Sequence, residues 1–174
     1  MKVLMVCLGN ICRSPMAEGL MQAKIEKYNL DMQVDSAGFE PFHTGDPPDY
    51  RAVSEMQNHG IDISHQRARL FNRSDFDTFD RIYVMDSNNY TDVQSVTLDA
   101  AHMQKVDFLL NVIHPGKNLP VPDPYYGGKN GFTTTYDLLD EATELIAKEI
   151  QKRKIDGSKP ISYKRRYPEC FTEN

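Results

Sequence analysis

A cysteine and an arginine six positions apart near the amino terminus could together transfer a phosphoryl group. Cys7 opens the segment CLGNICRSP, and Arg13 lies near its end. A loop of that length can curl round one tetrahedral anion, with its backbone N–H groups pointing inward and the guanidinium closing the ring as a bidentate fork. The same donors, with the start of a following helix, favour the thiolate, which is the nucleophilic form of Cys7. The pattern therefore indicates covalent phosphoryl transfer through sulfur.

The flanking sequence predicts a strand before this loop and a helix after it. Residues 2–7 are apolar and partly β-branched, as is typical of a buried strand. Gly9 and Asn10 tolerate positive φ, which an anion-binding loop needs. Ser14 and Pro15 predict the N-cap and the first position of a helix over 15–29, whose apolar residues recur at helical spacing.

The rest of the chain alternates predicted strands with predicted helices. We expect further strands near 33–36, 80–85 and 106–113, helices over 47–59, 87–96 and 133–154, and a helix or turn near 74–79. This alternation favours a three-layer α/β fold, with a central four-stranded parallel sheet and helices on both faces. Ligands of such sheets bind beyond the carboxyl ends of the strands, which is where Cys7 lies.

Length and composition predict one domain with a short appendage. The chain has 174 residues, of which 40% are hydrophobic, enough for a real core. We place a catalytic domain at 1–157 and a basic, aromatic tail at 158–174, in which Cys170 has no evident role. The change of character after Asp156 sets this boundary.

Charge and cysteine usage exclude several classes of protein. A net charge of −5 argues against binding to nucleic acid or to an anionic membrane, and no apolar run is long enough for a membrane helix. Three cysteines do not form a disulfide framework, and a reactive thiolate suits a reducing compartment, so we expect a cytoplasmic monomer. No cluster has metal-ligand spacing, and we expect neither a metal nor another cofactor.

The segment VCLGNICRSPMAEG resembles the signature of the low-molecular-weight protein tyrosine phosphatases. A second matching motif, Asp-Pro-Tyr-Tyr, covers residues 123–126, and the similarity extends over about residues 2–155. The resemblance implies an enzyme that acts on a phosphotyrosine-containing protein and releases inorganic phosphate.

The resemblance also implies a role for each residue of the site. Cys7 is then the nucleophile that forms a phosphocysteine, Arg13 and the backbone of residues 7–14 bind phosphate, and Asp123 is the general acid and later the general base. The phosphate-loop residues expected to line the substrate are Leu8, Gly9, Asn10, Ile11, Cys12 and Ser14. Cys12 is also a candidate resolving thiol that could capture an oxidised Cys7 as a disulfide.

Aromatic and polar residues elsewhere complete the expected site. Phe42, Tyr125 and Tyr126 are expected to wall the mouth of the pocket, where they suit a flat phenyl ring. Ser36 and His65, with Asn10, resemble a hydrogen-bond network that supports the phosphate loop, although the chain after His65 is one residue longer than the usual pattern. For Asp46, Asp49 and Asp86 we expect only helix capping or solvation.

Three other activities fit parts of this pattern. A protein arginine phosphatase shares the scaffold, but that branch has threonine where this chain has Ile11. Arsenate reduction needs further cysteines near the middle of the chain, and residues 13–169 contain none. A non-catalytic phosphotyrosine reader would need neither a nucleophile nor an acid. The arginine phosphatase and the reader remain open alternatives.

Overall fold

The computed structural model describes residues 1–128 and 130–156. Its four strands are β1 (Lys2–Val6), β2 (Gln33–Ala37), β3 (Arg81–Val84) and β4 (Val106–Phe108). Its α-helices are α1 (Arg13–Tyr28), α2 (Tyr50–Asn58), α3 (Asp75–Thr78), α4 (Ser87–Ser95), α5 (Ala100–Met103) and α6 (Gly131–Asp156). Short 3₁₀ helices are η1 (Pro41–His43), η2 (Leu109–Val112) and η3 (Pro124–Tyr126). The predicted tail, with Cys170, lies outside the described residues.

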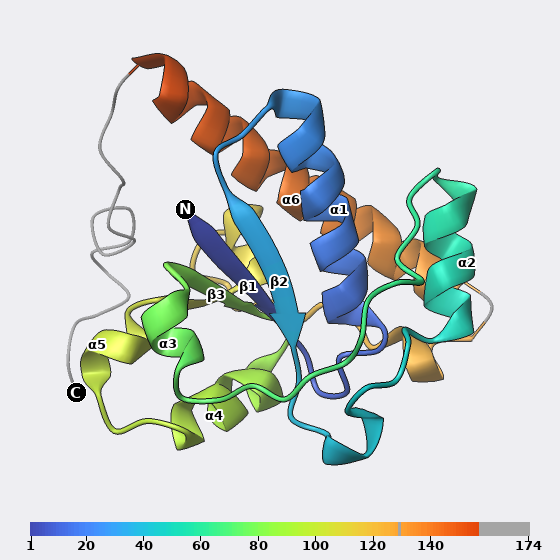
Figure 1. Ribbon diagram of the computed structural model, residues 1–174, viewed down its shortest axis with the longest axis horizontal. Coiled ribbons are helices and arrows are strands. Elements are labelled where there is room, and N and C mark those ends of the chain that lie inside the picture. Colours follow the sequence, from blue (N-terminus) through green and yellow to red (C-terminus); the bar gives the residue numbers. More distant parts are fainter. Residues whose placement is uncertain (129, 157–174) are drawn as a thin grey trace.

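The strands form one parallel sheet in the order β2-β1-β3-β4. Figure 1 shows α1 and α6 side by side against one face of this sheet, with α2 beyond them, and α3, α4 and α5 on the other side. The predicted three-layer α/β fold with a four-stranded parallel sheet is confirmed. The carboxyl ends of β1 and β3 lie next to each other, because Val6 is paired with Val84.

Both faces of the sheet are buried, as expected for parallel strands covered by helices. Val3 and Met5 of β1 pack with α1 and α6 on one face of the sheet. Leu4 and Val6 pack on the other face, with buried residues of α3 and α4. All four side chains are fully buried. This burial fixes the end of β1, and therefore the start of the loop that follows it.

Three predicted boundaries are wrong. The helix predicted over 47–59 begins at Tyr50, because Asp49 before it is the N-cap and accepts the Arg51 N–H. Helix α1 begins at Arg13 with Cys12 in the N-cap position, and no side chain caps it, so Ser14 is not the cap. The strand predicted over 106–113 ends at Phe108, where the chain turns into η2. The Asn111 side chain there donates to Asp107 Oδ1 at 2.6 Å, which stabilises the turn rather than an extended strand.

No helix within residues 1–128 and 130–156 combines the length and the apolar character that crossing a bilayer requires.

Candidate active site

The loop that follows β1 forms the floor of the site. Cys7 is 3% exposed, and its N–H donates to the Ala37 carbonyl at 3.3 Å, which ties the loop to β2. From residue 8 to residue 14, no backbone N–H donates to an acceptor among the described residues. Free N–H groups that lead into a helix form an anion-binding concavity. The loop can therefore hold a tetrahedral anion.

Asn10 and Gly9 shape this loop in different ways. Asn10 has a φ of +53°, the left-handed conformation predicted for this turn. Gly9 has no positive φ; instead, a Cβ added to it would lie 3.2 Å from Cδ2 of His43. The loop thus uses the left-handed tolerance of asparagine at Asn10, and a side chain at Gly9 would crowd the His43 ring.

The Asn10 side chain sets the direction of the hydrogen bonds that end at Cys7. Its Nδ2 donates to the hydroxyl oxygens of Ser14 at 2.9 Å and Ser36 at 2.8 Å, and its Oδ1 accepts the Arg69 N–H at 2.9 Å. Because Ser14 accepts from Asn10, its own hydroxyl proton can point to Cys7 Sγ, which at 3.0 Å is the nearer of its two acceptors. A hydroxyl donor at this distance favours a negatively charged sulfur.

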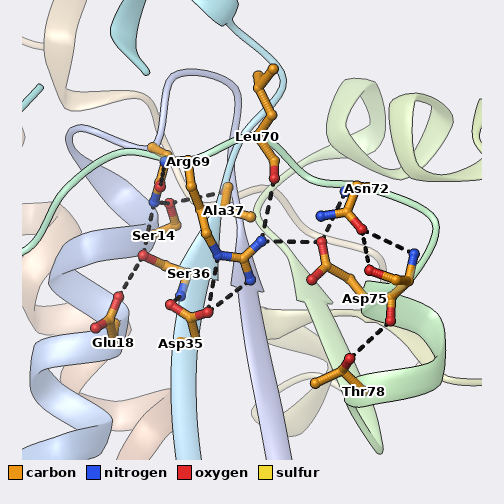
Figure 2. A network of polar contacts seen from close by, with 12 residues as sticks. Ser14, Glu18, Asp35, Ser36, Ala37, Arg69, Leu70, Asn72, Asp75 and Thr78 are labelled. Carbon is orange, nitrogen blue, oxygen red and sulfur yellow. Dashed lines mark hydrogen bonds and ion pairs between the residues drawn. The ribbon is translucent and has the colours of Figure 1, made fainter. Parts of the chain in front are cut away.

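The same chain of hydrogen bonds continues through Ser36 to Glu18, and Figure 2 shows this last step. The Ser36 hydroxyl donates to Glu18 Oε2 at 2.5 Å. Burial raises the pKa of Glu18 to about 7, against the opposing effect of the Ser36 hydrogen bond. The sequence did not single out Glu18, although its position one helical turn after Ser14 could have indicated it.

Arg69 connects this network to the edge of the sheet (Figure 2). Its Nε and Nη2 donate to Asp35 Oδ2 at 3.0 and 2.8 Å, and its Nη1 donates to Asp75 Oδ2 at 3.2 Å. Asp75 is buried and also accepts the Asn72 N–H at 2.9 Å. Carboxylates therefore hold the Arg69 side chain from two sides. This keeps the backbone N–H of Arg69 in place to donate to Asn10 Oδ1.

His65 lies away from this network. It is exposed on the segment between α2 and α3, and within the described part of the chain no hydrogen bond connects it to Asn10 or Ser36. The expected supporting contact of His65 is therefore not found, in agreement with the lengthened segment. Glu18 ends the chain of hydrogen bonds instead.

Two carboxylates hold the guanidinium of Arg13. Arg13 is buried, with 4% of its surface exposed. Its Nη1 lies 2.6 Å from Asp86 Oδ2, and its Nη2 lies 3.1 Å from Asp123 Oδ2. Asp86 Oδ1 meanwhile accepts the Asn89 N–H at 2.9 Å and caps α4. The expectation that Asp86 only caps a helix is wrong, because its second oxygen binds Arg13.

The charge of Arg13 is strongly favoured. Burial alone would lower its pKa, but the coulombic interaction with Cys7 and the hydrogen bond to Asp86 outweigh burial and raise the pKa above its usual value. Arg13 is thus a permanent cation beside the sulfur, with a planar fork that matches an anion.

A cleft of about 320 Å³ opens over the loop. It is lined by Cys7, Leu8, Gly9, Ile11, Cys12, Arg13, Glu40, Phe42, His43, Asp123 and Tyr125. Phe42 is 86% exposed and Tyr125 is 49% exposed, so both present aromatic surface at the mouth. Tyr126 belongs to η3 by its backbone, and its side chain lies outside the described residues.

Asp123 lies at the mouth of this cleft. Its Oδ1 accepts the Tyr125 N–H at 3.0 Å and so caps η3, while its side chain remains 38% exposed. Pro122 and Pro124 flank it and restrict its backbone. The carboxyl group is thus oriented by the chain around it and still open to solvent and ligand.

Cys12 also lines the cleft, and its thiol is buried. Burial raises the pKa of its thiol well above the usual range, and the coulombic effect of Asp49 adds to the shift. Cys12 is therefore a neutral thiol beside the candidate nucleophile.

Gly38 is a further residue that the site requires. A Cβ on Gly38 would lie 2.5 Å from the Leu8 carbonyl oxygen and 2.8 Å from the Asn10 nitrogen. Only glycine allows the end of β2 to approach the loop this closely.

Comparison with known proteins identifies the family. A sequence profile described as "Low molecular weight phosphotyrosine protein phosphatase" matches residues 2–155. The chain belongs to this family. The human low molecular weight phosphotyrosine protein phosphatase is 42% identical over 136 residues, which cover 77% of this chain and 85% of the human protein. Phosphatases are hydrolases, and this chain is a member of a hydrolase family.

Solved structures of low molecular weight phosphatases share the fold. A protein tyrosine phosphatase from Entamoeba histolytica matches with a TM-score of 0.80 and 36% identity, over 88% of this chain and 99% of that one. A Drosophila arginine phosphatase matches with a TM-score of 0.78 and 32% identity, over 86% and 97%. The shared fold therefore does not distinguish a tyrosine phosphatase from an arginine phosphatase.

Proposed function

We propose that this protein hydrolyses phosphotyrosine in proteins through a phosphocysteine intermediate. The observation that carries the proposal is the convergence of four groups on one cleft. The Cys7 sulfur accepts from Ser14, a loop of free backbone N–H groups surrounds it, Arg13 lies beside it, and Asp123 lies at the mouth. These are the nucleophile, the oxyanion donors and the acid that this reaction needs.

In the first step, the Cys7 thiolate attacks phosphorus, and a sulfur–phosphorus bond forms while the bond to the tyrosine oxygen breaks. The loop N–H groups and Arg13 stabilise the charge on the equatorial oxygens. A bound phosphate group competes with Asp123 for the Arg13 Nη2 and so frees the Asp123 carboxyl group to face the leaving oxygen. Asp123 then donates its proton to the leaving phenolate, which is a poor leaving group without it.

In the second step, water hydrolyses the phosphocysteine. The Asp123 carboxylate accepts a proton from the attacking water, the sulfur–phosphorus bond breaks, and inorganic phosphate leaves. Ser14 stabilises the Cys7 thiolate that departs from phosphorus, through the hydrogen bond that it donates. The enzyme returns to its starting state without a cofactor.

The walls of the cleft support an aryl phosphate as the substrate. Phe42 and Tyr125 offer aromatic surface on which a phenyl ring can stack, and Ile11 contributes an apolar side chain to the lining. An apolar side chain at position 11 does not hydrogen-bond a guanidino group, so it favours phosphotyrosine over phosphoarginine. We also expect this reaction to run in a monomer in the reducing cytoplasm, where Cys7 stays unoxidised.

Initial rates on phosphotyrosine, phosphoserine and phosphoarginine peptides, with EDTA present, test the proposal. We expect hydrolysis of the phosphotyrosine peptide alone and complete loss of turnover in Cys7→Ser, which should still bind inorganic phosphate. Acid quenching during turnover should trap phosphate on the peptide that contains Cys7. Turnover by Cys7→Ser would overturn the mechanism, and preference for phosphoarginine would overturn the substrate. Phosphopeptide binding without hydrolysis would favour a reader.

A further inference from the structure

Arg51 lies beside the cleft but does not line it, and it is anchored to the phosphate loop through Asp49. The Asp49 N–H donates to the Ile11 carbonyl at 2.8 Å, at the start of α2. Arg51 Nε donates to Asp49 Oδ1 at 2.9 Å, and its Nη2 donates to Asp49 Oδ2 at 2.8 Å. These hydrogen bonds hold the pKa of Asp49 below its usual range. The guanidinium is thus fixed in a bidentate pair relative to the phosphate loop.

The same guanidinium contacts the segment that carries Asp123. Its central carbon lies 4.9 Å from the centre of the Tyr125 ring and 4.9 Å from the centre of the Phe132 ring. Its Nη1 lies 3.5 Å from the Tyr125 carbonyl oxygen, which it can bond. The Tyr125 N–H in turn donates to Asp123 Oδ1. Arg51 is therefore connected to the carboxyl group of Asp123 through the backbone of Tyr125. Cation–π contacts of this kind are stabilising.

Other contacts within the described residues also restrain this segment. The Val121 N–H donates to the Met85 carbonyl at 2.7 Å, and Thr135 Oγ1 donates to the Pro122 carbonyl at 3.2 Å, both before Asp123. After it, Gly127 and Gly128 are exposed, and Gly128 has a φ of +65°. Arg13 also holds the Asp123 side chain directly, with its Nη2 3.1 Å from Oδ2, and the buried Pro124 lies where η3 packs on α6. Arg51 adds the contact that joins the ring and carbonyl of Tyr125 to the phosphate loop through Asp49.

We propose that Arg51 is a positioning residue, which braces the Asp123 segment against the phosphate loop and so sets how well Asp123 protonates the leaving group. This inference rests on the proposed function of Asp123 as the general acid. Proton transfer depends steeply on distance, and a misplacement of about 1 Å can cost about 10²-fold in rate. Because Val121 and Pro122 remain bound, we expect the loss without Arg51 to be smaller, roughly 10-fold.

The effect of Arg51 on Asp123 should depend on the planar shape of the guanidinium rather than on its positive charge. Lysine keeps the positive charge but offers neither the two parallel hydrogen bonds to Asp49 nor a planar group between two rings. Arg51→Lys should therefore resemble Arg51→Ala. Arg73→Ala removes the same charge from an exposed position before α3 and serves as the matched control.

The decisive kinetic measurement is kcat/KM over a series of aryl phosphates whose phenols differ in acidity. For Arg51→Ala we expect a loss of roughly 10-fold on phenyl phosphate but less than about 3-fold on esters of acidic phenols, which need little protonation. Inhibition by inorganic phosphate should not change, and Arg73→Ala should match the wild type. Equal losses across the series, or full activity in Arg51→Lys, would overturn the positioning role.

Hydrogen exchange gives a readout that does not depend on activity. In Arg51→Ala, amides of residues 123–128 should exchange faster than in the wild type, while those of residues 3–6 in β1 should not change. Unchanged exchange at 123–128 would overturn the brace even if the kinetics changed. If the wild type hydrolyses no aryl phosphate, the proposed function fails, and the exchange measurement still decides whether Arg51 braces this segment.

Discussion

Asp86 Oδ2 lies 2.6 Å from Nη1 of Arg13, while Oδ1 of the same carboxylate accepts the Asn89 N–H at the start of α4. One aspartate thus joins a helix on the far side of the sheet to the guanidinium beside the nucleophile. The cap orients Asp86, and Asp86 in turn orients Arg13, whose other terminal nitrogen faces Asp123.

We predict that Asp86→Asn weakens catalysis without unfolding the protein. Asparagine is a good N-cap, so α4 should keep its start, but the charge-assisted hydrogen bond to Arg13 is lost. A hydrogen bond to a charged group contributes roughly 1.5–3 kcal/mol, so kcat/KM should fall by roughly 10- to 100-fold. Asp99→Asn, which changes the cap of the distant α5, is the control. An unchanged kcat/KM in Asp86→Asn would show that Arg13 needs no such partner.

Asp123→Asn should slow hydrolysis of phenyl phosphate by roughly 10²–10⁴-fold, since asparagine cannot donate the proton. The loss should shrink for esters of acidic phenols, as steady-state rates across such a series would reveal. Asp31→Asn makes the same change of charge at an exposed site next to the end of α1 and should leave the rates unchanged. A uniform loss across the series would count against Asp123 as the acid.

Glu18 makes stability depend on pH. Its pKa is about 7 in the fold and about 4.5 in the unfolded chain, so the folded state holds the extra proton between these values. Stability from this group is therefore full below pH 4.5 and falls as the pH rises through 7, by up to about 3 kcal/mol.

Glu18→Gln should remove this dependence and still accept the hydrogen bond from Ser36. Urea unfolding between pH 4.5 and 8 measures the free energy of unfolding of both proteins. The free energy of unfolding of Glu18→Gln, relative to that of the wild type, should increase as the pH rises. Glu26→Gln, on the exposed face of the same helix, controls for the change in net charge. Parallel curves for Glu18→Gln and the wild type would contradict the prediction.

Gly38→Ala should damage the phosphate loop. Its Cβ would meet the Leu8 carbonyl oxygen and the Asn10 nitrogen, and neither backbone atom can move without distorting the loop. We expect a loss of roughly 1–3 kcal/mol in stability and weaker inhibition by inorganic phosphate. Gly19→Ala meets the Ile63 side chain instead, at 2.4 Å, and should lower stability while the folded protein keeps its affinity for phosphate. Normal phosphate affinity in Gly38→Ala would show that the loop tolerates the shift.

Local sequence determined the frame of this protein. The strand ending before Cys7, the turn at Asn10 and the helix that begins near Arg13 follow from residues within a few positions of one another, because φ preferences and hydrophobic periodicity act over that range. The alternation of strands and helices then determined the layers, and two spaced motifs identified the family.

The tertiary structure decided which polar groups meet. Asp86 and Asp123 lie 73 and 110 positions from Arg13, and the sequence offered other aspartates of equal standing for its partners. Glu18, not His65, ends the hydrogen-bond chain that starts at Cys7. Such pairings depend on the order β2-β1-β3-β4 and on loops that bring distant segments to one edge of the sheet, and only the packed fold sets the ångström distances on which hydrogen bonds depend.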